Sequence, residues 1–145
     1  MPITLTVPEG LLSPDAEGRV FAGLTDALLE VSQLAGNAFM EPNVVGTINR
    51  LPSAHVFAGG KPSAAAFVEL KLPSIALATS DAKQAFTERA TDVLEHAAEG
   101  RLPRDHIWTN IVYAEEGSWG IGGRTYANMD LVDAIGKAAQ LAPAA

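Results

Sequence analysis

The amino-acid sequence predicts one α+β domain made of two β-α-β units, with a four-stranded sheet and two helices on one face. Three observations lead to this prediction. Each half of the chain contains two segments with the apolar pattern of strands, and an amphipathic helical stretch lies between them. Each half then ends in a glycine-rich turn, at Gly59-Gly60 and at Gly122-Gly123. Duplication of a single unit explains this order.

The first half begins with residues 3–7, which alternate strictly between apolar and polar side chains, as expected of a strand with one buried face. Ser13 and Pro14 form a typical helix start, with a capping hydroxyl followed by proline at the first helical position. Apolar residues then recur at helical spacing, and we expect the helix to end near Gly36. Residues 43–51, rich in β-branched side chains, predict the second strand.

The second half repeats the pattern. Residues 66–72 predict a strand that ends at a proline, and Ser80 is the expected cap of the second helix. Apolar positions at helical spacing continue to Gly100, which ends the helix. Residues 107–114 predict the fourth strand.

The repeat also predicts the topology. A strand-helix-strand unit makes its two strands parallel, so two units give four strands with both helices on one face. The other face is then uncovered, which favours association between copies. We therefore expect residues 1–145 to form a single domain of two repeats, about 2–62 and 64–126, followed by a C-terminal helical tail.

Composition excludes several classes of function. The net charge of −7 and pI near 4.8 argue against nucleic acid as a partner. The chain has no cysteine, and its three histidines share no metal-ligand spacing, so neither a metal nor a cofactor is expected. It contains no apolar run long enough to span a membrane and no secretory signal pattern, so a cytoplasmic location is expected.

Three motifs carry a family resemblance. Pro2 directly after Met1, Glu9-Gly10 after the first strand, and Trp-Gly-Ile-Gly-Gly at 119–123 resemble 4-oxalocrotonate tautomerase and its relatives in the tautomerase superfamily. The resemblance covers about residues 2–126. The fused arrangement is similar to cis-3-chloroacrylic acid dehalogenase and malonate semialdehyde decarboxylase. It implies a homotrimer with active sites at subunit contacts.

Pro2 is the expected catalytic residue. Once Met1 is removed, its nitrogen is a secondary amine, and desolvation in an apolar pocket lowers the pKa of an amine toward neutrality. A neutral amine can act as a general base that moves a proton next to a carbonyl group. If Met1 is retained, this nitrogen is an amide without basicity. The second half has no proline at the corresponding place, near Ala65, so each chain has at most one such amine.

The substrate-binding residues of the resembling family are arginines, and this sequence departs from them. Leu11 follows the Glu-Gly pair, and Val45 and Trp108 stand where the second family arginine is expected. These departures argue against a dicarboxylate substrate. Lys71, at the end of the third strand, is the best remaining anion-binding candidate.

Further site candidates lie near the ends of the second and fourth strands. Arg50 and Arg124 could reach a site across a subunit contact. Trp119 matches the aromatic residue that walls the tautomerase pocket. Trp108 and Asn110 share one face of the fourth strand, where a polar and an aromatic group could both meet a ligand.

The sequence thus favours a cofactor-independent isomerase that acts on a small keto or enol carboxylate with Pro2 as general base. A second possibility keeps the fold and changes the reaction to hydration, dehalogenation or decarboxylation. In a third, the chain is a non-catalytic trimeric scaffold or binding protein. The missing arginines favour the third.

Overall fold

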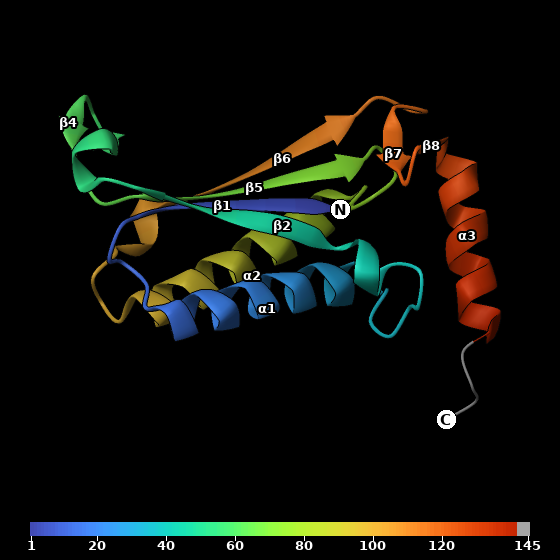
Figure 1. Ribbon diagram of the computed structural model, residues 1–145, viewed down its shortest axis with the longest axis horizontal. Helices are drawn as coiled ribbons and strands as arrows, with labels where there is room; N and C mark the ends of the chain where they lie inside the picture. Colours follow the sequence, from blue (N-terminus) through green and yellow to red (C-terminus); the bar gives the residue numbers. More distant parts are fainter. Residues whose placement is uncertain (142–145) are drawn as a thin grey trace.

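The computed structural model describes residues 1–141, which form a four-stranded sheet with two helices packed on one face and a third helix at one end (Figure 1). This confirms the predicted fold class. The helices and strands are β1 (Pro2–Pro8), α1 (Pro14–Val31), β2 (Val45–Leu51), β3 (Phe57–Ala58), β4 (Lys61–Pro62), β5 (Ala66–Pro73), α2 (Ser80–Ala98), β6 (Ile107–Ala114), β7 (Trp119–Ile121), β8 (Arg124–Tyr126) and α3 (Asn128–Leu141). None of these helices is long and apolar enough to cross a membrane.

The sheet has the strand order β2-β1-β5-β6. Strands β1 and β2 are parallel, as are β5 and β6, and each pair is connected through one helix. The two units meet at an antiparallel contact between β1 and β5. Because the units run in opposite directions, β1 begins at the same end of the sheet at which β5 and β6 finish.

Helix α1 begins as predicted, because the Ser13 hydroxyl accepts a hydrogen bond from the Ala16 amide at 3.2 Å. It ends at Val31, earlier than expected from Gly36. The chain leaves the helix because Gln33 adopts a left-handed conformation with φ 57°. The side-chain oxygen of Asn37 then accepts hydrogen bonds from the Phe39 and Met40 amides and holds the following loop.

The cap of helix α2 is Thr79 and not Ser80, one residue earlier than predicted. The Thr79 hydroxyl accepts a hydrogen bond from the Ala82 amide at 3.1 Å, which places Ser80 inside the first turn. The helix ends at Ala98, just before Gly100 as expected, and is followed by Glu99 in a left-handed conformation.

Each Gly-Gly pair forms the turn of a short hairpin. Gly59-Gly60 joins β3 to β4, and Gly122-Gly123 joins β7 to β8. All four glycines have φ between 57° and 81°, the conformation that two-residue hairpins require and that glycine adopts most easily. The hairpins lie at opposite ends of the sheet (Figure 1).

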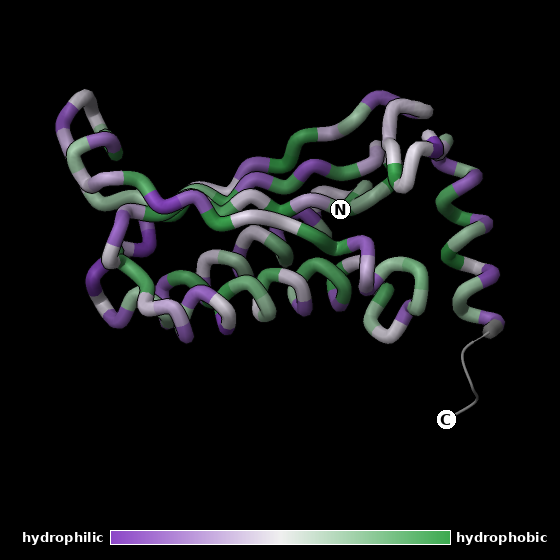
Figure 2. The backbone as a smooth tube through the Cα atoms, viewed as in Figure 1, coloured by the Kyte–Doolittle hydropathy of each residue, from purple (hydrophilic) through white to green (hydrophobic). Residues whose placement is uncertain are grey.

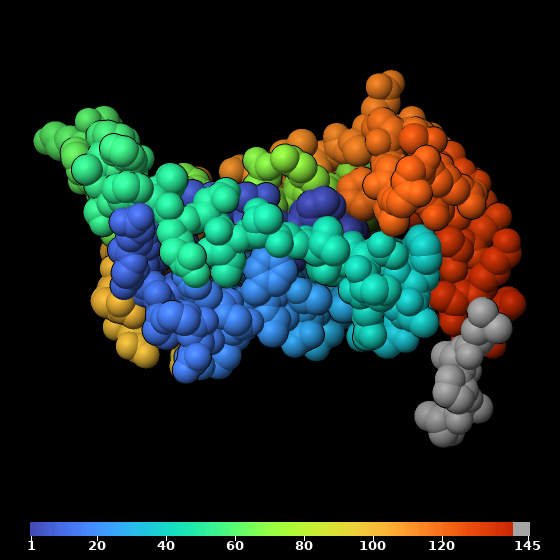
Figure 3. All heavy atoms as spheres, viewed as in Figure 1, coloured from blue at the N-terminus to red at the C-terminus, as the bar shows by residue number. Residues whose placement is uncertain are grey.

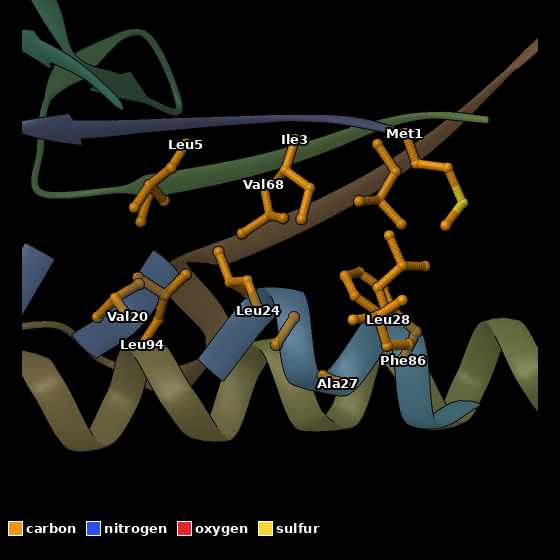
Figure 4. Close-up of a cluster of buried hydrophobic side chains, with 14 of the residues drawn as sticks. Met1, Ile3, Leu5, Val20, Leu24, Ala27, Leu28, Val68, Phe86 and Leu94 are labelled. Carbon is orange, nitrogen blue, oxygen red and sulfur yellow. The ribbon is translucent and has the colours of Figure 1, made fainter. Parts of the chain in front are cut away.

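The core lies between the sheet and the two long helices. Ile3, Leu5 and Val68 point from the strands toward α1 and α2, where they meet Leu24 and Phe86, all fully buried (Figure 4). Along the strands and helices, hydrophobic positions alternate with hydrophilic ones, as the two-layer packing requires (Figure 2).

The opposite face of the sheet is uncovered in the single chain, as predicted. It carries Pro2, Thr4 and Thr6 of β1 and Phe67, Glu69 and Lys71 of β5, which are half-buried or exposed. Trp108 and Val112 of β6 are 42% and 45% exposed on this face. This surface is called the open face below.

Candidate active site

The amino terminus lies at the end of β1 in a buried position. The Met1 residue is only 2% exposed, and its amino group donates a hydrogen bond to the Asn43 carbonyl oxygen. The Met1 carbonyl oxygen accepts a hydrogen bond from the Val45 amide at 3.2 Å, which continues the pairing of β1 with β2. The chain therefore fixes an amine at this end of the sheet.

Burial lowers the pKa of the Met1 amino group from its ordinary value of 8.0 to about 6. The physical cause is desolvation, which disfavours the charged form of an amine. An amine at this position is therefore mostly neutral at pH 7. A neutral amine has a free electron pair and can accept a proton.

A cavity of about 310 Å³ lies beside Met1. Its walls come from segments far apart in sequence: the end of α1 with the following loop, the connection between β5 and α2, the hairpin residue Trp119, and helix α3. In Figure 3 the N-terminal end of the chain (dark blue) is visible between the β7–β8 region (orange) and the loop before β2 (cyan).

The cavity lining is almost entirely apolar. Leu77, Leu131 and Ile135 are among the lining residues, and none of those in the described chain carries a charged side chain. The side-chain polar groups are few and include the hydroxyls of Ser32 and Thr79. Such a wall keeps water out and favours the neutral form of an adjoining amine.

Pro2 directly follows Met1, and its side chain lies on the open face and does not line the cavity. It pairs with Val45 of β2, and one further step of the antiparallel register with β5 places it opposite Lys71. The Lys71 ammonium is 3.3 Å from a Glu69 carboxylate oxygen, and the Lys71 side chain is 58% exposed. Lys71, Arg50 and Arg124 were the cations named from the sequence. The strand register places Lys71 next to Pro2.

Trp119 and Arg124 lie in the β7–β8 hairpin at the same end. Trp119 is 9% exposed and lines the cavity. The Arg124 guanidinium lies 4.7 Å from the centre of the Tyr126 ring and 3.6 Å from an Asp130 carboxylate oxygen. Its charge is therefore partly balanced within the hairpin and the start of α3.

Arg50 lies at the other end of the sheet. It is paired with Val7, so most of the length of β1 separates it from Pro2. Its guanidinium donates two hydrogen bonds to the Glu17 carboxylate, which hold the pKa of that carboxyl below its usual range. In the single chain, Arg50 therefore contacts helix α1 and not the cavity.

Trp108 and Asn110 share the open face, at the start and middle of β6. Trp108 stacks on Phe67 with 5.8 Å between ring centres, and Asn110 is paired with Glu69. Neither residue lines the cavity within the chain. Both are therefore available to a neighbouring molecule that covers the open face.

Two parts of the cavity were not identified from the sequence. Helix α3 supplies Leu131, Val132 and Ile135, and the end of α1 supplies Ser32. The apolar spacing in residues 131–135 could have indicated a buried helix face. No sequence pattern indicates that this face packs beside the amino terminus. Among residues 1–141, no group of three His, Asp or Glu side chains is placed to hold a metal ion.

Comparisons with known proteins find matches in structure. No family model and no curated protein matches the chain. A fused 4-OT that forms a symmetric trimer superposes with a TM-score of 0.73 at 16% identity, over 90% of this chain and 98% of that one. N1, a member of the cis-3-chloroacrylic acid dehalogenase family, gives 0.74 at 14% identity, over 97% and 100%.

A third solved structure is Pt0534 inactivated by 2-oxo-3-pentynoate, with a TM-score of 0.72 at 14% identity over 90% of this chain and 98% of that chain. The agreement extends over both β-α-β units. The chain thus has the tautomerase superfamily fold, and the resemblance drawn from Pro2 and the glycine-rich turns is confirmed at the level of the fold.

Proposed function

We propose that this chain is a cofactor-independent tautomerase, in which Pro2 becomes the amino terminus and acts as general base on a small keto or enol carboxylate. The observation that carries the proposal is the buried, desolvated amine position beside an apolar cavity. The tautomerase superfamily fold supports the same reading.

Removal of Met1 is the first requirement. While Met1 is present, the Pro2 nitrogen is an amide, and the Met1 side chain occupies space beside the cavity. After removal, the Pro2 nitrogen is a secondary amine at the end of β1. The same apolar surroundings then lower the pKa of the proline ammonium, in the direction found for the Met1 amine.

The proposed reaction is a proton transfer without change of oxidation state. The Pro2 amine takes a proton from a carbon next to the carbonyl group, and the electron pair moves to the carbonyl oxygen to give an enolate. The Pro2 ammonium returns the proton to a different atom, which regenerates the neutral base. Lys71 holds the substrate carboxylate or the enolate oxygen, and Trp119 keeps water away from the amine.

A homotrimer is the proposed assembly. The open face exposes Trp108, Val112 and part of Phe67, which a neighbouring copy would cover. Fused 4-OT structures that share this fold are described as trimers. In the assembly, Trp108, Asn110 and Arg124 contribute to a neighbour's site, whereas Arg50 remains paired with Glu17. Light scattering that gives the mass of three chains supports the proposal, and the mass of one chain contradicts it.

Chemical labelling tests the nucleophilic amine directly. The structural neighbour Pt0534 is inactivated by 2-oxo-3-pentynoate, an electrophilic ketone that a neutral amine can attack. Intact mass first establishes that Met1 is absent. The reagent should then add once per chain, on the tryptic peptide 2–19. Labelling elsewhere, or none at all, contradicts a reactive Pro2.

Turnover tests the reaction. Ketonisation of phenylenolpyruvate should be catalysed by the Met1-free protein, and Pro2→Ala, which replaces the rigid secondary amine by a primary amine, should lower kcat/KM by about 10-fold or more. Thr4→Ala is the matched control, since Thr4 is the next residue of β1 on the same face. Equal activity of Pro2→Ala and the parent protein would contradict a requirement for the secondary amine of Pro2.

Hydration, dehalogenation or decarboxylation is the second candidate. The likeness to N1 of the cis-3-chloroacrylic acid dehalogenase family, which extends over nearly the whole of both chains, favours it. Activity on 3-haloacrylates without ketonisation of phenylenolpyruvate selects this reaction. Absence of both activities in a Met1-free trimer selects a non-catalytic scaffold.

A further inference from the structure

The cavity beside the amino terminus is larger than a proton transfer requires. Its volume is about 310 Å³, whereas an engineered apolar cavity of about 150 Å³ in another protein holds benzene. The space therefore accommodates a group about the size of a substituted phenyl ring. Much of the far wall is helix α3, which lies outside the two repeated units.

The chemistry of the lining restricts what can enter. Since no charged side chain lines the cavity in the described chain, a carboxylate placed inside would be desolvated without a partner. The nearby ammonium of Lys71 lies on the open face beside Pro2 and not in the cavity. The carboxylate of a ligand is thus stabilised at the mouth of the cavity, near Lys71, and an uncharged part of the ligand is stabilised in the cavity interior.

One polar atom in the lining lacks a partner. The Ser32 hydroxyl oxygen is buried and has no hydrogen bond within the chain. Buried hydroxyls in folded proteins nearly always have a partner, because leaving one unpaired is costly. Its oxygen has almost no accessible surface, so a polar atom on the ligand supplies that partner only when the Ser32 side chain rotates toward the cavity.

Helix α3 is held firmly enough to define the depth of the cavity. The Asn37 side-chain amide donates a hydrogen bond to the Ile135 carbonyl oxygen at 3.1 Å, and Asp130 accepts one from the Ala127 amide at 3.1 Å. Ile135 and Leu131 project from this helix into the lining. The side chain at position 135 therefore limits the size of the bound group.

We infer that this cavity is a specificity pocket that selects monocarboxylates with an uncharged, largely apolar substituent of about phenyl size, with α3 setting its depth and the Ser32 hydroxyl bonding a polar atom on that substituent. The inference rests on the proposed function for the position of the carboxylate near Pro2. It names the substrate class of that site.

Calorimetric binding to the Met1-free Pro2→Ala protein tests the pocket without any turnover. We expect 3-phenylpropanoate to bind at least about 10-fold tighter than propanoate or adipate, because burial of one ring is worth that much. Equal affinities for the three would overturn the inference. Since none of the three ligands has a keto or enol group, no turnover can occur, and such a failure is distinct from loss of tautomerase activity in the parent.

Variants of α3 test the depth. Ile135→Trp should weaken binding of 3-phenylpropanoate about 10-fold and leave propanoate unchanged. Met129→Trp is the matched control on the same helix, since Met129 is 66% exposed and does not line the cavity. If Ile135→Trp does not fold, Ile135→Ala should instead increase the affinity for 3-(2-naphthyl)propanoate. Unchanged ligand preference in a folded Ile135 variant would overturn the role of α3.

The Ser32 hydroxyl is tested with a ligand pair. 3-(4-Hydroxyphenyl)propanoate should bind several-fold tighter than 3-phenylpropanoate, and Ser32→Ala should remove that difference. A difference that persists in Ser32→Ala would show that another group bonds the ligand.

Discussion

The two ends of the sheet are built from corresponding parts of the two β-α-β units, yet they differ in what fills them. At the end where β1 begins, the residues surround a cavity of about 310 Å³. At the opposite end, the corresponding space is occupied by Leu11, Leu12 and Leu102, which are 7%, 6% and 2% exposed. One unit thus contributes core where the other leaves room for a ligand.

The hairpins make the same contrast. Alignment of the Gly-Gly turns places Val56 in the position of Trp119, and both residues are buried. Trp119 lines the cavity, whereas Val56 packs where the chain before β5 returns, held by a hydrogen bond of 2.9 Å between its carbonyl oxygen and the Ser63 amide. The hairpin of the second unit therefore supplies a wall of the cavity, whereas the hairpin of the first unit packs against the chain that leads into β5.

The strands show why only the first unit can carry a terminal amine. The burial patterns of β1 and β5 match when Pro8 is aligned with Pro73. In this alignment of the two repeats, Phe67 is the residue equivalent to Pro2. This corrects the position near Ala65 expected from the sequence. Phe67 lies in the chain interior and stacks on Trp108, so the second unit uses this position for packing. The two repeats share the same strand and helix arrangement, and differences such as Pro2 against Phe67 make the two ends of the sheet unlike each other.

The largest expected difference in stability comes from introducing one carboxylate at each end of the sheet. Leu12→Asp should lower the free energy of unfolding by about 3 kcal/mol or more, because it buries an unpaired carboxylate. Ile75→Asp, at the corresponding loop of the cavity end, should cost less than about 1 kcal/mol, since Ile75 is 40% exposed. Urea unfolding measures both. Equal losses would show that the two ends are packed alike.

A cavity-creating pair gives the next effect. Leu102→Ala should cost about 2–4 kcal/mol, because the closely packed end cannot fill the space. Leu77→Ala should cost about half as much, since Leu77 already borders the cavity and has fewer atoms around it. Thermal or urea unfolding of both variants checks this. A larger loss for Leu77→Ala would contradict the packing difference.

The amino terminus makes the cavity end sensitive to pH. For a chain prepared with Met1 retained, the amine pKa is about 6 when folded and 8.0 ordinarily, so the unfolded state binds more protons between these values. Stability should therefore fall as pH decreases from 8 to 6, by up to about 2 kcal/mol. Acetylation of the Met1 amine should remove this part of the pH dependence. An unchanged profile after acetylation would contradict the burial of the amine.

The smallest expected effects separate two candidate cations. Lys71→Gln should raise KM for phenylenolpyruvate about 10-fold, because the register places Lys71 opposite Pro2. Arg50→Gln should change KM less than twofold, since its guanidinium pairs with Glu17 at the other end of β1. Steady-state kinetics decides between them. A higher KM in Arg50→Gln alone would place Arg50 in a neighbour's site.

Much of the fold was predictable because its signals are local. Strict alternation in residues 3–7 defines the buried face of β1, and Ser13 caps α1 through a bond to an amide three residues away. The errors were also local. Gln33 ends α1 early through a left-handed backbone conformation that its side chain does not reveal.

The candidate site was predictable only in part. Pro2, Trp119 and Lys71 were named from the sequence, and the structure places all three at one end of the sheet. Arg50 was named as well, but it lies at the other end because β2 runs parallel to β1. The sequence positions of charged residues do not tell which of them share an end of a folded sheet.

The sequence by itself determined the repeat, the strand faces, the hairpin turns and the proline that follows Met1, since each depends on residues a few positions apart. Only the tertiary structure decided that helix α3 packs beside the amino terminus and that a cavity remains there. The reason is physical: a cavity is what several distant segments leave unfilled, so its size and polarity depend on all their side chains together.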